Sequence, residues 1–203
     1  MTSRLRVGSV AFLLAGLSGL TLLVRRQGPI AGDLPMVQAL QSLSSPSLDR
    51  VALIVSASTS PIGLVFLAGA VAVILAGRRR LREAALVVGT GSAEIATLLL
   101  RLLTERPRPD ASLIRVVEIA PGTSFPSGHA ADTAALAVLL GHLTRFQSHS
   151  QRTGAWAALG VFALAVGVVR VYLGTHWPSD VIGGYLMGAA LGLALGGFAQ
   201  NRR

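Results

Sequence analysis

The chain has 203 residues, of which 52% are hydrophobic and 13% are charged, and its mean hydropathy is +0.62. Soluble domains carry about 25% charged residues, so this composition excludes an ordinary soluble protein and indicates a membrane protein with a single domain. The net charge of +9 comes from 18 basic residues, all arginine, interspersed with long apolar runs. This pattern is typical of loops that orient membrane helices and argues against a nucleic-acid partner. Because cysteine is absent, disulfides, thiolate metal sites and cysteine nucleophiles are excluded.

Six stretches approach the roughly 20 apolar residues that a membrane-spanning helix needs. They cover residues 7–24, 51–76, 84–103, 129–146, 154–174 and 181–199. The first follows Arg4 and Arg6 like a signal peptide, but no small-residue cleavage site comes after it, so we expect a retained helix. The second contains a polar run, 56–61, which predicts a late start or a kink. The sequence thus predicts an all-α integral membrane bundle of six transmembrane helices.

Two smaller patterns add detail to this plan. Within residues 27–50, apolar side chains recur at helical spacing, which predicts a short helix on the membrane interface: Met36, Val37, Leu40 and Leu43. In the last span a small residue recurs every four positions: Gly184, Gly188, Gly192 and Gly196. Such a stripe lets helix backbones approach closely, so we expect it to pack against another helix.

The arginines also predict the orientation of the bundle. If the chain begins in the cytoplasm, ten of them fall on that side: Arg4, Arg6, Arg78, Arg79, Arg80, Arg82, Arg145, Arg152, Arg202 and Arg203. Eight fall on the other side: Arg25, Arg26, Arg50, Arg101, Arg106, Arg108, Arg115 and Arg170. Three of these eight belong to the polar clusters described next, which leaves five. Because cytoplasmic loops are enriched in arginine, we expect both termini in the cytoplasm and the loops after the third and fifth spans outside it.

Three polar clusters lie on this outer side. The first joins Arg101, near the end of the third span, to Arg108, seven residues later and past the helix-breaking Pro107. Two guanidinium groups can therefore reach one anion from different directions, and their planar donors match phosphate oxygens. The alternative is that both arginines only extend from a helix end to the membrane interface.

The second cluster is the turn Phe125-Pro126-Ser127-Gly128-His129, which opens the fourth span. Backbone N–H groups at a helix start favour anions, and a glycine lets a ligand approach the backbone closely. Ser127 supplies a hydroxyl to such a ligand and can also cap the helix. The turn is therefore a candidate anion site that also holds a titratable histidine.

The third cluster joins Arg170, at the end of the fifth span, to His176 in a short loop and Asp180 at the start of the sixth. A carboxylate that accepts a hydrogen bond from an imidazole fixes its tautomer and makes the other ring nitrogen a better nucleophile. Alternatively, Asp180 serves only as an acid near a helix N-terminus, with Ser179 as the cap.

Together the clusters resemble the signature of the type 2 phosphatidic acid phosphatase superfamily. That signature is a basic residue, six residues and Arg-Pro, then Pro-Ser-Gly-His, then Ser-Arg, five residues, His, three residues and Asp. The first part fits Arg101 and Arg108-Pro109, with Arg101 where the family usually has lysine. The second fits without change, and in the third Val169 replaces the usual serine. With the six-span plan the resemblance covers most of the chain, with a core at about residues 84–199 of a single domain, 1–203.

The resemblance implies a role for each matched residue, with no metal and no cofactor. His176 would attack phosphorus and form a phosphohistidine, Asp180 would orient His176, and His129 would protonate the leaving oxygen and then assist water. The others would hold the phosphate oxygens: Arg101, Arg108, Ser127, Gly128 and Arg170. Without the family, the residues point to the same anion site but do not decide which histidine attacks.

The sequence therefore predicts a multi-pass phosphatase of the cell membrane, with its active site outside, that hydrolyses lipid phosphates or diphosphates. Undecaprenyl diphosphate, phosphatidic acid and phosphatidylglycerol phosphate all present a suitable terminal phosphate, and the short chain with its outward site favours polyprenyl diphosphate. One alternative is a lipid-phosphate transporter or scaffold without turnover. A vanadate-dependent haloperoxidase shares the signature, but six apolar spans argue against it. The oligomeric state is left open.

Two acids, Glu94 and Asp132, lie within predicted spans. Acids inside a membrane are costly and usually face the interior of a helix bundle. We expect them to pair with arginines or polar groups below the active site, or to discriminate between substrates.

Overall fold

The computed structural model describes residues 2–144 and 147–200, and within these ranges the chain forms nine α-helices and no β-strand. The helices are α1 (Ser3–Val24), α2 (Asp33–Gln41), α3 (Pro46–Ser58), α4 (Pro61–Gly77), α5 (Leu81–Gly89), α6 (Ser92–Thr104), α7 (Gly128–Leu143), α8 (His149–Tyr172) and α9 (Pro178–Gln200). The prediction of an all-α fold is confirmed over these residues. Four residues used in the span and charge predictions lie outside the described ranges: Arg145, Phe146, Arg202 and Arg203.

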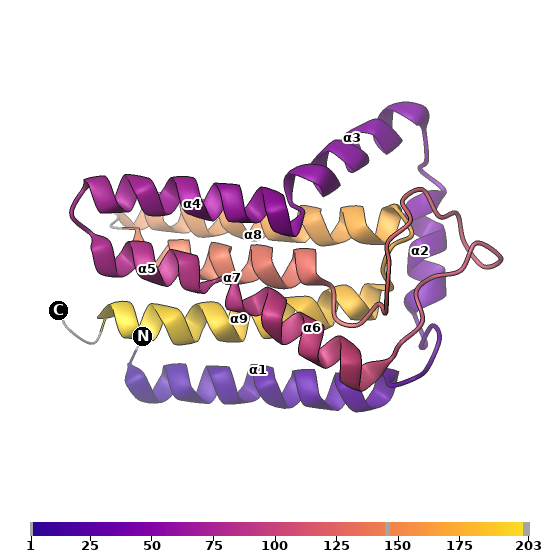
Figure 1. Ribbon diagram of the computed structural model, residues 1–203, viewed down its shortest axis with the longest axis horizontal. Helices are drawn as coiled ribbons and strands as arrows, with labels where there is room; N and C mark the ends of the chain where they lie inside the picture. Colours follow the sequence, from indigo (N-terminus) through magenta and orange to yellow (C-terminus); the bar gives the residue numbers. More distant parts are fainter. Residues whose placement is uncertain (1, 145–146, 201–203) are drawn as a thin grey trace.

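The long helices run roughly along one axis, with α7 and α9 packed against each other in the bundle (Figure 1). Helix α2 lies across one end, and α3 tilts away from the bundle near that end (Figure 1). The loop between α6 and α7 and the junction between α8 and α9 also lie there. Helix α1 starts and α9 ends at the opposite end. We call these the site end and the terminal end.

Four segments are long and apolar enough to cross a membrane: Ser3–Val24, Leu81–Thr104, His149–Tyr172 and Pro178–Ala199. Helices α3 and α4 form a fifth if they count as one span, although they are bent by 58°. The described part of the chain thus supplies four or five such spans, not the predicted six. The difference lies in α7, which has 16 residues and is buried by its neighbours along most of its length.

The bend between α3 and α4 has a local cause. The Ser60 hydroxyl accepts a hydrogen bond from the Gly63 N–H at 3.2 Å, and Pro61 occupies the first turn of α4. A capping serine followed by proline starts a new helix and does not continue the old one. The kink predicted within residues 56–61 is confirmed.

The short helix predicted between the first two spans is α2. Its residue Val37 is fully buried in a cluster with Ile114 and Trp177, while Met36 is exposed. Helix α2 therefore packs on the loops at the site end with one face. This contact fixes loops that carry several polar side chains of the candidate site.

The outer faces of the long helices are apolar, whereas small residues line the central contact. Phe12, Phe66 and Phe198 are all more than half exposed, which suits a surface in contact with lipid. Along the glycine stripe of α9, a Cβ added at Gly188 would lie 2.1 Å from the Ala131 backbone oxygen of α7. The other three glycines also face α7 at 3.0 Å or less from such a Cβ. The predicted packing role of this stripe is confirmed.

A pair of identical substitutions tests this contact. We expect Gly188→Ala to destabilise the protein by about 1–3 kcal/mol, because its methyl group forces α7 and α9 apart. Gly160→Ala on α8 is the matched control, since a Cβ there meets nothing within 4 Å. Thermal unfolding in detergent, followed by circular dichroism, compares the two variants. Equal melting temperatures for both would contradict the packing argument.

Candidate active site

The turn before α7 is held against the end of α6. Helix α6 ends at Thr104, whose hydroxyl donates to the Phe125 backbone oxygen at 3.0 Å. Arg101, in the last turn of α6, donates from Nε to the Pro126 backbone oxygen at 3.3 Å. These bonds bring a guanidinium group next to the N-terminus of α7.

The same turn is also tied to α9. The Ser127 N–H donates to the Asp180 backbone oxygen at 3.0 Å. The Ser127 hydroxyl is buried, has no hydrogen-bond partner and does not cap α7, so the capping alternative is wrong. An unpartnered buried hydroxyl is costly, and here it stands at a helix N-terminus where an anion is favoured.

His176 lies in the loop between α8 and α9 and is almost fully buried. Its Nε2 lies 3.3 Å from Arg108 Nη1, and its Nδ1 lies 3.5 Å from Asp180 Oδ2. The second distance exceeds an ordinary hydrogen bond, and Asp180 Oδ2 accepts instead from the Trp177 N–H at 2.8 Å. One ring nitrogen thus faces an arginine and the other faces a carboxylate.

Helix α3 completes the other side of the site through Ser56. The His129 Nε2 atom lies 3.2 Å from the Ser56 backbone oxygen. Arg170 donates from Nη1 to the Ser56 hydroxyl and, at 2.9 Å, to Glu118 Oε1. The sequence did not predict Ser56 or Glu118 as site residues. The only signal for Ser56 was its place in the polar run that bends the second span.

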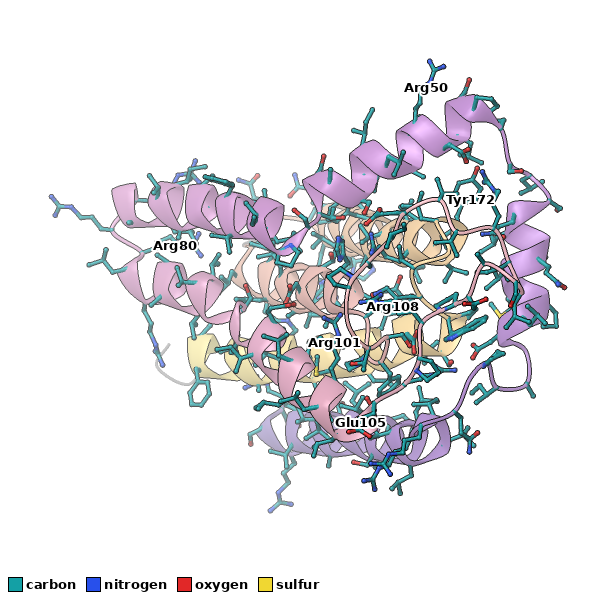
Figure 2. All side chains as sticks on the ribbon, turned by 45° about the vertical axis from the view of Figure 1, so that its right-hand side comes forward. Arg50, Arg80, Arg101, Glu105, Arg108 and Tyr172 are labelled. Atoms are coloured by element: carbon teal, nitrogen blue, oxygen red, sulfur yellow. The ribbon has the colours of Figure 1, made fainter. Side chains whose placement is uncertain are left out.

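Contacts link all eight predicted site residues into one cluster: Arg101, Arg108, Ser127, Gly128, His129, Arg170, His176 and Asp180. Arg101 and Arg108 lie together in the interior, whereas Arg50 points outward (Figure 2). Arg101 Nη2 would be 3.5 Å from a Cβ added at Gly128, so the first two clusters meet there. The third cluster joins them through Arg108 and His176.

Burial and mutual repulsion dominate the electrostatics of the loop residues. Burial, followed by the charges of Arg101 and Arg170, lowers the pKa of Arg108 to about 10, so it stays protonated at neutral pH. Burial and the nearby Arg108 lower the pKa of His176 well below its usual value. Burial opposes ionisation of Glu118, but its hydrogen bond with Arg170 lowers the pKa of that carboxyl. The site thus holds a neutral imidazole among cations.

The most buried polar contact at this end is made by Arg106, which the sequence analysis counted only as a loop charge. It is fully buried and donates to Asp180 Oδ1 at 2.6 Å and to Asp33 Oδ2 at 2.7 Å. It also donates to the Ser179 hydroxyl at 2.7 Å. The sequence did not predict this buried role of Arg106. Its position beside Pro107 and the matched motif was the only hint in the sequence.

This arrangement has a defined chemical capacity. Three arginines, an unpartnered hydroxyl and a helix N-terminus surround a neutral imidazole nitrogen. Such donors match the oxygens of a phosphate group, and the imidazole nitrogen that faces Arg108 can act as a nucleophile once a phosphate takes up the Arg108 donors. The apolar helices around the site indicate a membrane protein, and the site itself has the groups needed to bind a phosphate and react with it.

The chain belongs to the PAP2 superfamily, whose profile matches residues 82–203. It is 35% identical over 148 residues to the decaprenylphosphoryl-5-phosphoribose phosphatase of Mycobacterium tuberculosis, covering 70% of this chain and 76% of that one. It is 31% identical over 136 residues to an undecaprenyl-diphosphatase of Bacillus subtilis, covering 65% and 66%. Its fold is similar to the crystal structure of a transmembrane PAP2-type phosphatidylglycerolphosphate phosphatase from Bacillus subtilis, with a TM-score of 0.82. The two chains are 22% identical, and the match covers 96% of this chain and 98% of that one. The predicted family is confirmed.

The Arg106 contacts predict a large stability effect. We expect Arg106→Met to destabilise the protein by about 3–5 kcal/mol, because it leaves the carboxylates of Asp33 and Asp180 buried without their cation. Arg26→Met is the control, since the Arg26–Glu105 pair is mostly exposed and such pairs contribute little. Unfolding in detergent measures both. A similar small effect for the two variants would show that the Arg106 network is not essential.

Proposed function

We propose that this protein is an integral membrane phosphatase that hydrolyses lipid phosphates or diphosphates through a phosphohistidine on His176. The observation that carries this proposal is the environment of the His176 ring. Its Nε2 faces Arg108 at 3.3 Å, and its Nδ1 faces Asp180. A phosphate held by the arginines would bring its phosphorus atom to Nε2. The relatives named above act on lipid-linked phosphates, which suggests the same substrate class for this chain.

In the first step, the lone pair of His176 Nε2 attacks phosphorus. A P–N bond forms, and the P–O bond to the lipid breaks. The leaving oxygen takes a proton from His129, whose imidazolium form is stabilised by the negative charge of the bound phosphate. Asp180 stabilises the positive charge that develops on His176 and keeps Nδ1 protonated.

In the second step, a water molecule attacks the phosphorus of the phosphohistidine. His129, now neutral, accepts a proton from that water as the P–N bond breaks. His176 returns to its starting state, and inorganic phosphate leaves. During both steps, Arg101, Arg108 and Arg170 stabilise charge on the phosphate oxygens, with the Ser127 hydroxyl and the Gly128 N–H. The three arginines supply the positive charge that a metal ion provides in other phosphatases.

We further propose that the site end faces the extracytoplasmic side, with six helical passages that include α7 and the bent pair. Several exposed arginines lie at the terminal end, around the starts of α1, α5 and α8 (Figure 1). At the site end, four arginines are committed to the pocket or the buried network: Arg101, Arg106, Arg108 and Arg170. The remaining loop charge then favours a cytoplasmic terminal end.

Trapping the intermediate tests the mechanism. With a lipid phosphate labelled in the phosphate group, an alkaline quench should recover label on the purified wild-type protein, because phosphohistidine survives in base. His176→Ala should carry no label and release no phosphate above background. His129→Ala should turn over about 10²–10⁴-fold more slowly. EDTA should not change the wild-type rate.

The control for these variants is His149→Ala, which changes an exposed histidine at the start of α8. It should keep both the label and the rate. If His176→Ala releases phosphate at the wild-type rate, His176 is not the nucleophile. If the wild-type protein binds lipid phosphates but hydrolyses none, the protein is a binding or transport protein.

Two single-cysteine variants test the orientation, since the chain has no cysteine of its own. Ser44 is exposed between α2 and α3 at the site end, and Ser150 is exposed in the first turn of α8 at the terminal end. In intact cells, a membrane-impermeant maleimide should label Ser44→Cys. It should label Ser150→Cys only after the membrane is permeabilised. The reverse pattern would place the active site in the cytoplasm.

A further inference from the structure

A cavity of about 410 Å³ lies beside the phosphate site, between α4, α5, α6 and α7. Most of its wall is apolar and includes Leu64, Val65, Ile95 and Leu136. Val65 and Ile95 are largely exposed on the outer faces of α4 and α6, so the cavity reaches the surface that contacts lipid. Its shape and chemistry suit a hydrocarbon chain that enters from the membrane.

Two carboxyl groups, on Glu94 and Asp132, interrupt this apolar wall. Asp132 is only 7% exposed, and its Oδ1 has no hydrogen-bond partner. Glu94 Oε2 is likewise buried without a partner, as is the hydroxyl of the neighbouring Thr97. Among the described residues, neither acid forms an ion pair within 4.0 Å, and no basic side chain lines the cavity. Buried polar atoms are normally hydrogen-bonded, so three unpartnered ones in one place indicate a ligand.

These polar atoms adjoin the phosphate site directly. A Cβ added at Gly128 would lie 2.7 Å from Glu94 Oε2 and 3.5 Å from Arg101 Nη2. Asp132 follows His129 by three residues on α7, so it lies on the same side of the helix about 4.5 Å further along the axis. In the mechanism above, His129 protonates the leaving oxygen of the lipid. The atoms that follow this oxygen therefore pass Glu94 and Asp132 on the way to the apolar cavity.

We propose that Glu94 and Asp132 form a subsite for a hydroxyl-bearing linker between the phosphate that is removed and the hydrocarbon chain, and that they disfavour a second phosphate there. This proposal rests on the proposed function. Carboxylate oxygens accept hydrogen bonds from the hydroxyl groups of a glycerol or sugar. A second phosphate at the same place meets the two acids, while the nearby Arg101 is engaged with the Pro126 oxygen and with the reacting phosphate, so lipid diphosphates are the poorer substrates.

A matched pair of substrates tests the subsite. One is 1-oleoylglycerol 3-phosphate, whose linker has a free hydroxyl, and the other is the same molecule without that hydroxyl. The wild-type enzyme should prefer the first by about 10- to 100-fold in kcat/KM, because a hydrogen bond to a charged acceptor is lost with the second. In the double variant Glu94→Gln, Asp132→Asn, this preference should fall at least about threefold, since neutral amides accept more weakly.

A second pair of substrates, farnesyl phosphate and farnesyl diphosphate, tests whether the two acids disfavour a second phosphate. The ratio of their kcat/KM values in the double variant is divided by the ratio in the wild type, which cancels their intrinsic reactivities. Removing the two acids should shift this ratio several-fold toward the diphosphate. The control is Glu105→Gln, which neutralises an exposed acid at the end of α6 and should leave both ratios unchanged.

The outcomes separate the subsite from the proposed function. If no lipid phosphate is hydrolysed at all, the proposed function fails. If hydrolysis occurs but the double variant slows every substrate equally, the two acids only support the fold or balance the charge of Arg101, and the subsite proposal is wrong. If both ratios change as expected, the two acids bind the hydroxyl of the linker and disfavour a second phosphate.

Discussion

The structure of the site end depends on one buried cation. Arg106 comes from the loop after α6 and contacts Asp33 at the start of α2 and Asp180 at the start of α9. Removing either carboxylate or the guanidinium would leave a charge deep in an apolar bundle, which is far more costly than an exposed charge. The network therefore fixes the relative positions of the groups that it joins. It connects α2, which lies across the site end, with α9, which carries Asp180.

This geometry has a consequence for His176. Asp180 accepts short hydrogen bonds from Arg106 Nη1 and from the Trp177 N–H, at 2.6 and 2.8 Å, and its Oδ2 lies 3.5 Å from His176 Nδ1. Arg106 and the Trp177 N–H thus largely balance the negative charge of Asp180 without the His176 imidazole. Burial and the neighbouring Arg108 lower the pKa of His176 and keep its ring neutral in the resting site. In the proposed mechanism, positive charge that develops on the ring would draw the carboxylate closer to Nδ1.

The structure brings the matched motif residues together, as their fixed spacing at helix ends leads one to expect, and their roles in catalysis stay predictions. The sequence predicted the all-α fold, the α3–α4 kink and the glycine stripe from local patterns alone. It missed Arg106, Ser56 and Glu118 because their importance comes from partners far along the chain. The count of six spans stays a prediction at α7, since a central helix buried by its neighbours need not be as long as one that contacts lipid throughout.

The two departures from the family signature are explained by contacts that the sequence did not show. Val169, in place of serine, packs against the cluster that contains Ala52 of α3. The same helix brings the Ser56 hydroxyl to Arg170, so a hydroxyl still reaches that guanidinium. Arg101, in place of lysine, uses Nε for the Pro126 oxygen and retains two further nitrogens for a phosphate. A lysine has a single nitrogen and cannot divide its donors between backbone and ligand in this planar way.

The balance of charge across the pocket bears on the choice of substrate. Arginines surround the place of the reacting phosphate, whereas the adjoining cavity contains two acids and no arginine among its lining residues. A short chain with an outward site favoured a polyprenyl diphosphate when only the sequence was considered. A diphosphate, however, needs positive charge at two successive positions along the lipid, and this pocket concentrates it at one. The change from cations to carboxylates along the path of the leaving group is what underlies the proposed preference for a lipid whose phosphate is attached to a neutral, hydroxylated linker.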